Sequence, residues 1–92
     1  MSVNVASISF EHHDYDERGD VLYLTAAGSE GPPKRACATP EGHGIEYDRA
    51  GKVTALTLVN VRWLLDRDGE LTITWPAARV QAADLADALP SA

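Results

Sequence analysis

The sequence has little cysteine, few basic residues and no long hydrophobic run. Each of these absences excludes some classes of protein. Cys37 is the one cysteine among 92 residues, so no disulfide can form within the chain. No stretch approaches the roughly 20 apolar residues that a membrane-spanning helix needs, and the first residues lack the charged and apolar segments of a signal peptide. We therefore expect a cytoplasmic protein with no membrane partner.

Acidic residues outnumber basic ones, 14 against 8, which gives a formal net charge of −6 at pH 7. Such a field repels a phosphate backbone, and no cluster of Lys and Arg offsets it locally. The charge therefore argues against nucleic acid as a direct ligand, whereas a basic protein partner fits it.

The length and composition indicate one globular domain over residues 1–92. An apolar fraction of 45% lies in the globular range, so wholesale disorder is not expected.

A short pattern recurs three times and predicts chain reversals. Each copy runs from an apolar residue through Asp, two polar or small residues and Gly to a charged and an apolar residue, at 15–21, 47–53 and 65–71. The Asp carboxylate can accept a backbone hydrogen bond at the start of a type I turn. The Gly can then adopt the left-handed conformation of a bulge. The pattern therefore predicts three β-hairpins.

The segments that flank these turns predict short strands. We expect a loop at 28–35 because it holds two Gly and two Pro, and strands at 7–14, 21–27, 36–39, 43–48, 52–61, 62–65 and 70–75. Alternation at 71–75 indicates a strand with one solvated face, whereas 53–61 has apolar residues on both faces.

The last segment predicts a short helix within residues 80–89. Leu85 and Leu89 are four positions apart, so one side is apolar, and Asp84 suits the positive end of the helix dipole. Two turns are marginal alone, so this helix must dock on the sheet. The predicted fold is α+β, mainly β: an antiparallel hairpin sheet of about six short strands with one C-terminal helix.

Two runs of the sequence resemble a known family. Tyr-Asp-Glu-Arg-Gly-Asp-Val-Leu-Tyr-Leu at 15–24 and Gly-Ile-Glu-Tyr-Asp-Arg-Ala-Gly-Lys-Val-Thr-Ala-Leu-Thr-Leu at 44–58 resemble the bacterial small-protein family catalogued as domain of unknown function 2283. Asn60 matches the Asn or Asp near the end of that family's second strand. The resemblance covers roughly residues 8–61, and leaves an additional hairpin at 62–76 and the C-terminal helix outside it.

The resemblance implies a compact β-rich domain without an established activity. It gives no catalytic residue to carry over. Some members look like the partner gene of a small toxin, which implies an antitoxin-like role.

The histidines are the most site-like residues. On a strand, His12 and His13 point to opposite faces, so they cannot share one metal ion unless a bulge intervenes. A metal site would need His43 or a carboxylate from a neighbouring strand. We favour solvent-facing polar residues. Cys37 with His43 as its base is a second candidate, but nothing nearby would lower the thiol pKa, so a partly buried structural thiol is favoured.

Two further patterns have a structural and a functional interpretation. Asp66-Arg67-Asp68-Gly69 is like the start of a calcium loop but lacks the remaining ligands, so a turn is favoured. Trp63 and Trp75 flank the third turn and are predicted to face each other across it. Packing in the core is favoured over a protein-binding hot spot formed with Arg62 and Arg67.

No nucleophile with a base, metal-ligand set or phosphate-binding loop can be assembled from these residues. We therefore expect no cofactor and a non-enzymatic interaction module, antitoxin-like, that uses its acidic surface or an exposed sheet face to bind a basic protein. The alternative is a small-ligand or metal-binding protein or enzyme that uses His12, His13 and His43. Unpaired strand edges and the two-sided apolar strand at 53–61 also predict a homodimer.

Overall fold

The computed structural model describes residues 3–26, 35–74, 77–86 and 88–89, and its described part is mainly β. Its elements are β1 (Val3–Val5), β2 (Ile8–Asp16), β3 (Val21–Ala26), β4 (Arg35–Ala38), β5 (Gly44–Tyr47), β6 (Val53–Val59), α1 (Val61–Asp68), β7 (Glu70–Ile73), β8 (Ala78–Gln81) and the 3-10 helix η1 (Ala82–Leu85). The predicted fold class, a mainly β antiparallel architecture with a helix, is confirmed.

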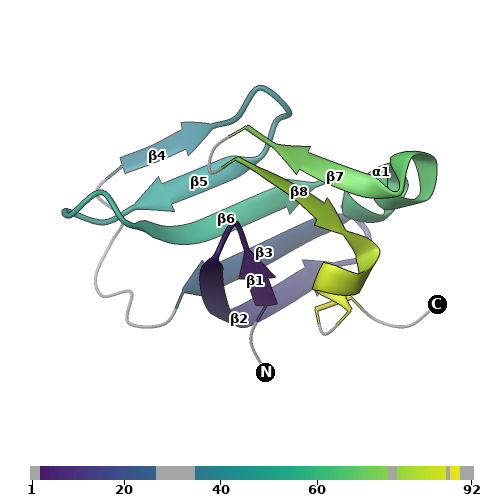
Figure 1. Ribbon diagram of the computed structural model, residues 1–92, viewed down its shortest axis with the longest axis horizontal. Helices are drawn as coiled ribbons and strands as arrows, with labels where there is room; N and C mark the ends of the chain where they lie inside the picture. Colours follow the sequence, from purple (N-terminus) through teal and green to yellow (C-terminus); the bar gives the residue numbers. More distant parts are fainter. Residues whose placement is uncertain (1–2, 27–34, 75–76, 87, 90–92) are drawn as a thin grey trace.

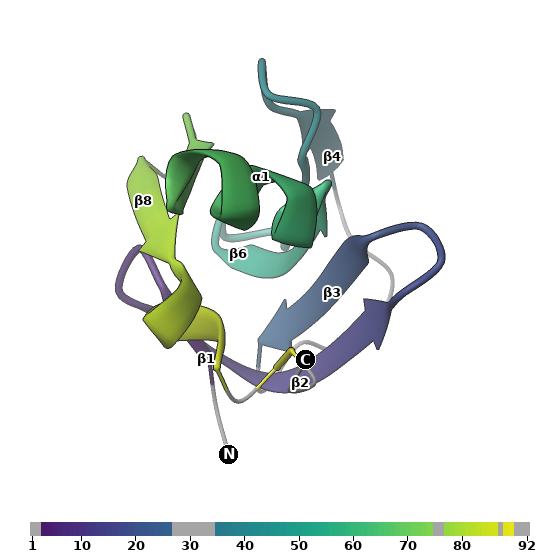
Figure 2. The same cartoon turned by 90° about the vertical axis from the view of Figure 1, so that its right-hand side faces the viewer.

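Six strands form one antiparallel sheet in the order β1-β2-β3-β6-β5-β4, and β7 and β8 form a separate hairpin. The hairpin lies across the sheet, with α1 at one end of the molecule (Figure 1). Seen from that end, the sheet curls around a centre whose open side faces α1, β8 and η1 (Figure 2). The curled sheet and these covering elements therefore enclose the core between them.

The core takes its residues from both layers. The sheet buries alternate side chains on its inner face, among them Phe10, Leu22, Leu24, Ile45, Leu56 and Leu58. The covering layer buries Val61, Leu71, Ile73, Val80 and Leu85 against them. Each fully buried side chain of this size stabilises the fold by about 1.5–3 kcal/mol. In β7, Leu71 and Ile73 are buried and Thr72 is exposed, as the alternation predicts.

The second predicted turn is confirmed in detail. β5 and β6 are antiparallel, and Asp48 Oδ1 accepts hydrogen bonds from the amides of Ala50 and Lys52, both at 2.9 Å. Gly51 has φ 82°, the left-handed conformation expected of the bulge glycine.

The first predicted turn is confirmed as a hairpin between β2 and β3, but its backbone differs from the prediction. The left-handed residue is Asp20, at φ 56°, and Gly19 is not left-handed. Asp tolerates this conformation better than most residues with a Cβ atom. A role for the Asp20 carboxylate, described below, depends on this placement.

The hairpin predicted over 62–76 is wrong. Residues 61–68 form α1 and only the following residues, 70–73, form a strand. Val61, Leu64 and Leu65 have the i, i+3, i+4 spacing of an apolar helix face, and all three pack in or against the core. Gly69, at φ 76°, ends the helix as its C-cap, with its amide donating to Leu65 O. The Asp-x-x-Gly segment thus ends a helix here.

The C-terminal helix predicted within 80–89 is also wrong in its extent. Residues 78–81 pair with β7 as β8, and the helix that follows is the four-residue η1. Asp84 Oδ2 accepts a 2.8 Å hydrogen bond from the Gln81 amide, so Asp84 does cap its start. Leu85 and Ala88 are buried. Pairing with β7 uses the residues that would have formed the first turn of a longer helix.

Smaller differences concern strand ends and one unpredicted strand. β1 was not predicted, and β6 ends at Val59. The outer face of β6 is half-buried, whereas Leu56 and Leu58 lie on its inner, buried face. The predicted loop at 28–35 lies outside the described residues except for Arg35, which begins β4. No helix among the described residues is long and apolar enough to span a membrane.

Candidate functional site

The first turn of α1 is held by a residue from a distant hairpin. Asn60, at the N-cap, is left-handed and makes no side-chain cap. Asp20 replaces it: its Oδ1 accepts from the Arg62 amide at 2.8 Å and its Oδ2 from the Trp63 amide at 3.1 Å. The Asp20 carbonyl also accepts from the Val61 amide at 3.2 Å. The turn between β2 and β3 therefore fixes where α1 begins.

Tyr15 completes this junction. Its hydroxyl donates a 2.7 Å hydrogen bond to Asp20 Oδ1, and the Arg62 guanidinium lies 5.8 Å from the centre of its ring. Burial and the bond to Asp20 raise the pKa of Tyr15 to about 12. Burial alone would raise the pKa of Asp20, but the hydrogen bonds from Tyr15, Arg62 and Trp63 outweigh it and lower that pKa.

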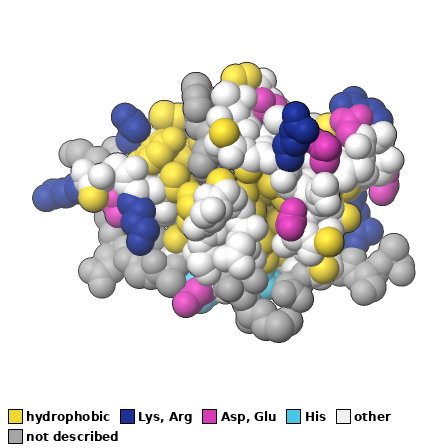
Figure 3. All heavy atoms as spheres, in the orientation of Figure 1, with side chains coloured by type: hydrophobic (Ala, Val, Ile, Leu, Met, Phe, Trp, Pro, Cys, Tyr) yellow, Lys and Arg dark blue, Asp and Glu magenta, His cyan; other side chains and the backbone are white. Residues whose placement is uncertain are grey.

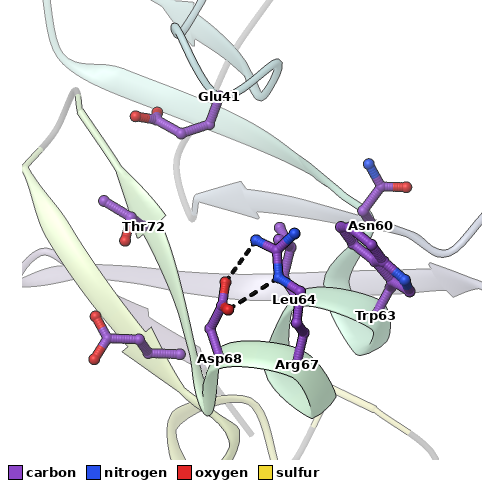
Figure 4. A pocket seen from close by; sticks show the side chains of 8 residues that line it. Glu41, Asn60, Trp63, Leu64, Arg67, Asp68 and Thr72 are labelled. Carbon is purple, nitrogen blue, oxygen red and sulfur yellow. Dashed lines mark hydrogen bonds and ion pairs between the residues drawn. The ribbon is translucent and has the colours of Figure 1, made fainter.

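A groove of about 560 Å³ runs beside the helix that this junction positions. It is lined by Glu41, Asn60, Trp63, Leu64, Arg67, Asp68, Glu70 and Thr72. In Figure 4, Glu41 lies at the top, Thr72 at the left and Asn60 with Trp63 at the right, and Arg67 and Asp68 lie between Thr72 and Trp63. The groove thus joins α1, β7 and the loop between β4 and β5.

Among the described residues of this region, Trp63 is an exposed large hydrophobic residue, with 56% of its surface accessible. The Arg67 guanidinium lies over it, with Cζ 4.4 Å from the ring centre. Arg67 also binds Asp68 through two bonds, Nε to Oδ1 at 2.9 Å and Nη2 to Oδ2 at 2.7 Å. Their mutual hydrogen bonds raise the pKa of Arg67 and lower the pKa of Asp68. A planar cation is therefore held between an indole and a carboxylate.

The remaining charged groups of the groove are acidic. Glu41 accepts hydrogen bonds from the amide of Thr74 at 3.0 Å and from its hydroxyl, and these bonds lower the pKa of Glu41. Glu70 lies 3.6 Å from Arg79 in an exposed ion pair. Among the described lining residues there are three carboxylates and one guanidinium, so the groove keeps an excess of negative charge even though Arg79 pairs with Glu70. Acidic and basic side chains lie side by side over the α1 end of the molecule (Figure 3).

The three histidines are not brought together. His12 pairs with Thr25 and His13 with Leu24, so they remain on opposite faces of β2, and both are exposed. A bulge does interrupt β2, but it lies before His12. His43 is buried beside β6, on the far side of β3 from β2. Among the described residues no three His, Cys, Asp or Glu side chains are grouped to hold a metal ion.

His43 is a structural residue of the core. Its Nδ1 accepts a 3.1 Å hydrogen bond from the Val59 amide, so the neutral ring carries its proton on Nε2. Burial lowers the pKa of His43, although the backbone of Thr72 and the carboxylate of Glu41 oppose the change. Because Nδ1 is already an acceptor, His43 is not placed to serve as a base for Cys37. Cys37 is half-buried in β4, as expected for a structural thiol.

The predictions for the two tryptophans have different outcomes. The core packing predicted for Trp63 is wrong, because Trp63 lies on the exposed side of a helix and not on a hairpin strand. Trp75 lies outside the described residues. Of the two arginines grouped with them, Arg67 lines the groove and Arg62 lies over Tyr15. The calcium-loop pattern at 66–69 is the end of α1, with Asp68 bound to Arg67.

Two residues important to this region, Asp20 and Glu41, were not predicted. Both come from loops far from α1 in sequence, and no local pattern links them to Trp63.

Comparison with known proteins gave no further assignment: no protein-family model matches the chain, and no curated protein or solved structure is significantly similar to it. The resemblance to domain of unknown function 2283 therefore stays a prediction from the residues.

Proposed function

We propose that this protein is a non-enzymatic interaction module that binds a basic segment of a partner protein in the groove beside Trp63. The observation that carries the proposal is the exposure of Trp63 on a helix fixed at its first turn. Tryptophan supplies a large rigid contact surface and is enriched among residues that dominate binding energy.

Charge supports a basic partner. Glu41, Asp68 and Glu70 line the groove, and Arg67 is the one basic residue among the described lining residues. The whole chain carries a formal charge of −6. Such a field attracts a cationic segment and accelerates its association. The same field disfavours nucleic acid as the ligand.

The family resemblance suggests the class of partner, and the compartment is a separate proposal. An acidic module that covers a basic protein is antitoxin-like, as the family resemblance implies, and we propose that it acts in the cytoplasm.

Peptide binding tests the proposal. A fluorescent peptide that alternates basic residues and alanine should bind the protein, and an acidic peptide of equal length should not. Trp63→Ala should weaken binding at least about tenfold, as expected of a hot-spot residue. His13→Ala is the control, because His13 is an exposed ring on β2 that is not among the residues lining the groove. Equal binding by Trp63→Ala and the wild type would contradict the proposal.

We also propose that the protein forms a homodimer. The described sheet ends at β1 and β4, which are not paired with each other. Its outer face presents Tyr23 beside Thr57. Light scattering should give a dimer for the wild type and a monomer for Tyr23→Glu. A monomeric wild type at micromolar concentration would rule out this state.

A further inference from the structure

We infer that the groove selects an arginine side chain of the partner, and that Arg67 occupies the position of that arginine in the free protein. The inference rests on the proposed function and names the group that the groove recognises.

The geometry around Arg67 is that of a guanidinium site. Its Cζ lies 4.4 Å from the Trp63 ring centre, and its Nε and Nη2 reach the two carboxylate oxygens of Asp68 at 2.9 and 2.7 Å. Stacking on an aromatic ring and a two-pronged bond to a carboxylate are the two contacts by which proteins distinguish arginine from lysine. A lysine ammonium is not planar, so it cannot stack on the ring in this way, and it cannot place two parallel N–H donors on one carboxylate.

This internal occupant is weakly held. The side chains of Arg67 and Asp68 are 53% and 43% exposed, and ion pairs in water contribute little because solvent screens them and side-chain entropy opposes them. Displacing Arg67 into solvent therefore has a small free-energy cost. The indole and the carboxylate then become available to another guanidinium.

A partner's arginine would make more favourable electrostatic interactions in the groove than Arg67 does. Arg67 is bonded to Asp68, whereas Glu41 and Glu70 line the same groove without a bond to Arg67. A segment that enters the groove with a further basic residue can be attracted by these two carboxylates as well. The alternative, that Arg67 itself attracts an acidic partner, conflicts with the excess of carboxylates around it.

The experiment compares peptides of one sequence that carry arginine, lysine or citrulline at the central position. Wild-type protein should bind the arginine peptide several-fold more tightly than the other two. Arg67→Ala and Arg67→Gln should each bind it about three- to tenfold more tightly than the wild type, because the internal competitor is removed. Arg18→Ala, which removes an exposed arginine from the turn between β2 and β3, is the matched control and should leave binding unchanged.

Asp68 provides the opposite test. Asp68→Asn should weaken binding of the arginine peptide several-fold, because the group that accepts the two guanidinium hydrogen bonds loses its negative charge. Asp66→Asn is its control, since Asp66 is on the same helix but does not line the groove. Circular dichroism checks that each variant is folded.

The outcomes separate the two proposals. If the wild type binds basic peptides but both Arg67 variants bind no more tightly, Arg67 is not a competitor and the inference fails. Equal affinity for arginine and lysine peptides would also overturn it. If neither the wild type nor any variant binds a basic peptide, the proposed function itself fails.

Discussion

The carboxylate of Asp20 accepts a 2.8 Å hydrogen bond from the amide of Arg62, a residue 42 positions later in the chain. A side chain from a β-hairpin thereby does what an N-cap residue normally does within its own helix. The start of α1, and with it the orientation of Trp63, depends on a contact between segments that are remote in sequence.

The first prediction is that Asp20→Ala will lower the free energy of unfolding by about 1–2 kcal/mol, because two helix amides and the Tyr15 hydroxyl lose their acceptor. Asp20→Asn should lose less, since it keeps one oxygen and tolerates the left-handed backbone. Urea unfolding measures both. Asp14→Ala, at an exposed position of β2, is the control. A loss no larger than that of the control would show that the cap does not stabilise the fold.

The second prediction concerns tyrosine ionisation. The folded-state pKa of Tyr15, at about 12, lies above its ordinary value of 10.0. The folded protein therefore retains this proton more strongly than the unfolded chain, and stability should be lost as pH rises from 10 towards 12. Ultraviolet absorbance should show a late-titrating phenol that is missing in Tyr15→Phe. In Asp20→Asn it should titrate earlier. A wild-type titration without a late step would contradict the burial and bonding of Tyr15.

The third prediction concerns mild acid. The folded-state pKa of His43 is lower than its ordinary value of 6.5, so the unfolded chain takes up this proton first. The stabilisation from neutral His43 is complete above that value and is lost as pH falls below it. Unfolding between about pH 7.5 and pH 5.5 should therefore need less urea as pH falls.

Two histidine variants check this assignment. His43→Asn should remove most of the pH dependence in that range, whereas a His12→Gln, His13→Gln double variant should retain it because both side chains are exposed. If the double variant loses the dependence and His43→Asn keeps it, the assignment to His43 is wrong.

The fourth prediction concerns the end of α1. Gly69 has φ 76°, and a Cβ at this position would meet no heavy atom within 4 Å beyond its own chain neighbours. Gly69→Ala should therefore destabilise the protein by about 1 kcal/mol through backbone conformation alone. Gly44→Ala is the control: Gly44 lies in β5 outside the left-handed region, and its Cβ would make an ordinary contact with Thr57. Thermal unfolding should show a clear decrease for Gly69→Ala only.

The fifth prediction concerns the C-terminal segment. Leu85 is fully buried, so Leu85→Ala should lower the free energy of unfolding by about 2–5 kcal/mol. Leu89→Ala should have a smaller effect because Leu89 is only partly buried. Equal effects of the two substitutions in urea unfolding would show that Leu85 does not anchor this segment.

The sequence was sufficient for features determined by neighbouring residues. The hairpin between β5 and β6 follows from Asp48 and Gly51, whose hydrogen bonds and conformation lie within the turn itself. The same pattern gave a wrong hairpin prediction at residues 65–71, because a left-handed glycine occurs at the C-terminal end of a helix as readily as in a hairpin bulge. The spacing of Val61, Leu64 and Leu65 was the local signal that distinguishes the two.

The site was less predictable than the fold. Residue type alone identified Trp63 and Arg67 as binding candidates, but not that they stack on one helix beside a groove. Glu41 reaches that groove from the loop before β5, and Asp20 reaches α1 from the first hairpin. These contacts depend on tertiary packing. No sequence pattern within ten residues of Glu41 or Asp20 predicts them.

The attachment of α1 to Asp20 means that the surface around Trp63 depends on closure of the first hairpin. Until β2 and β3 have closed on their turn, the amides of residues 62 and 63 lack this acceptor, and the indole is not held in place. A partner that binds Trp63 in the way we propose would therefore distinguish the folded protein from a chain in which this hairpin is open.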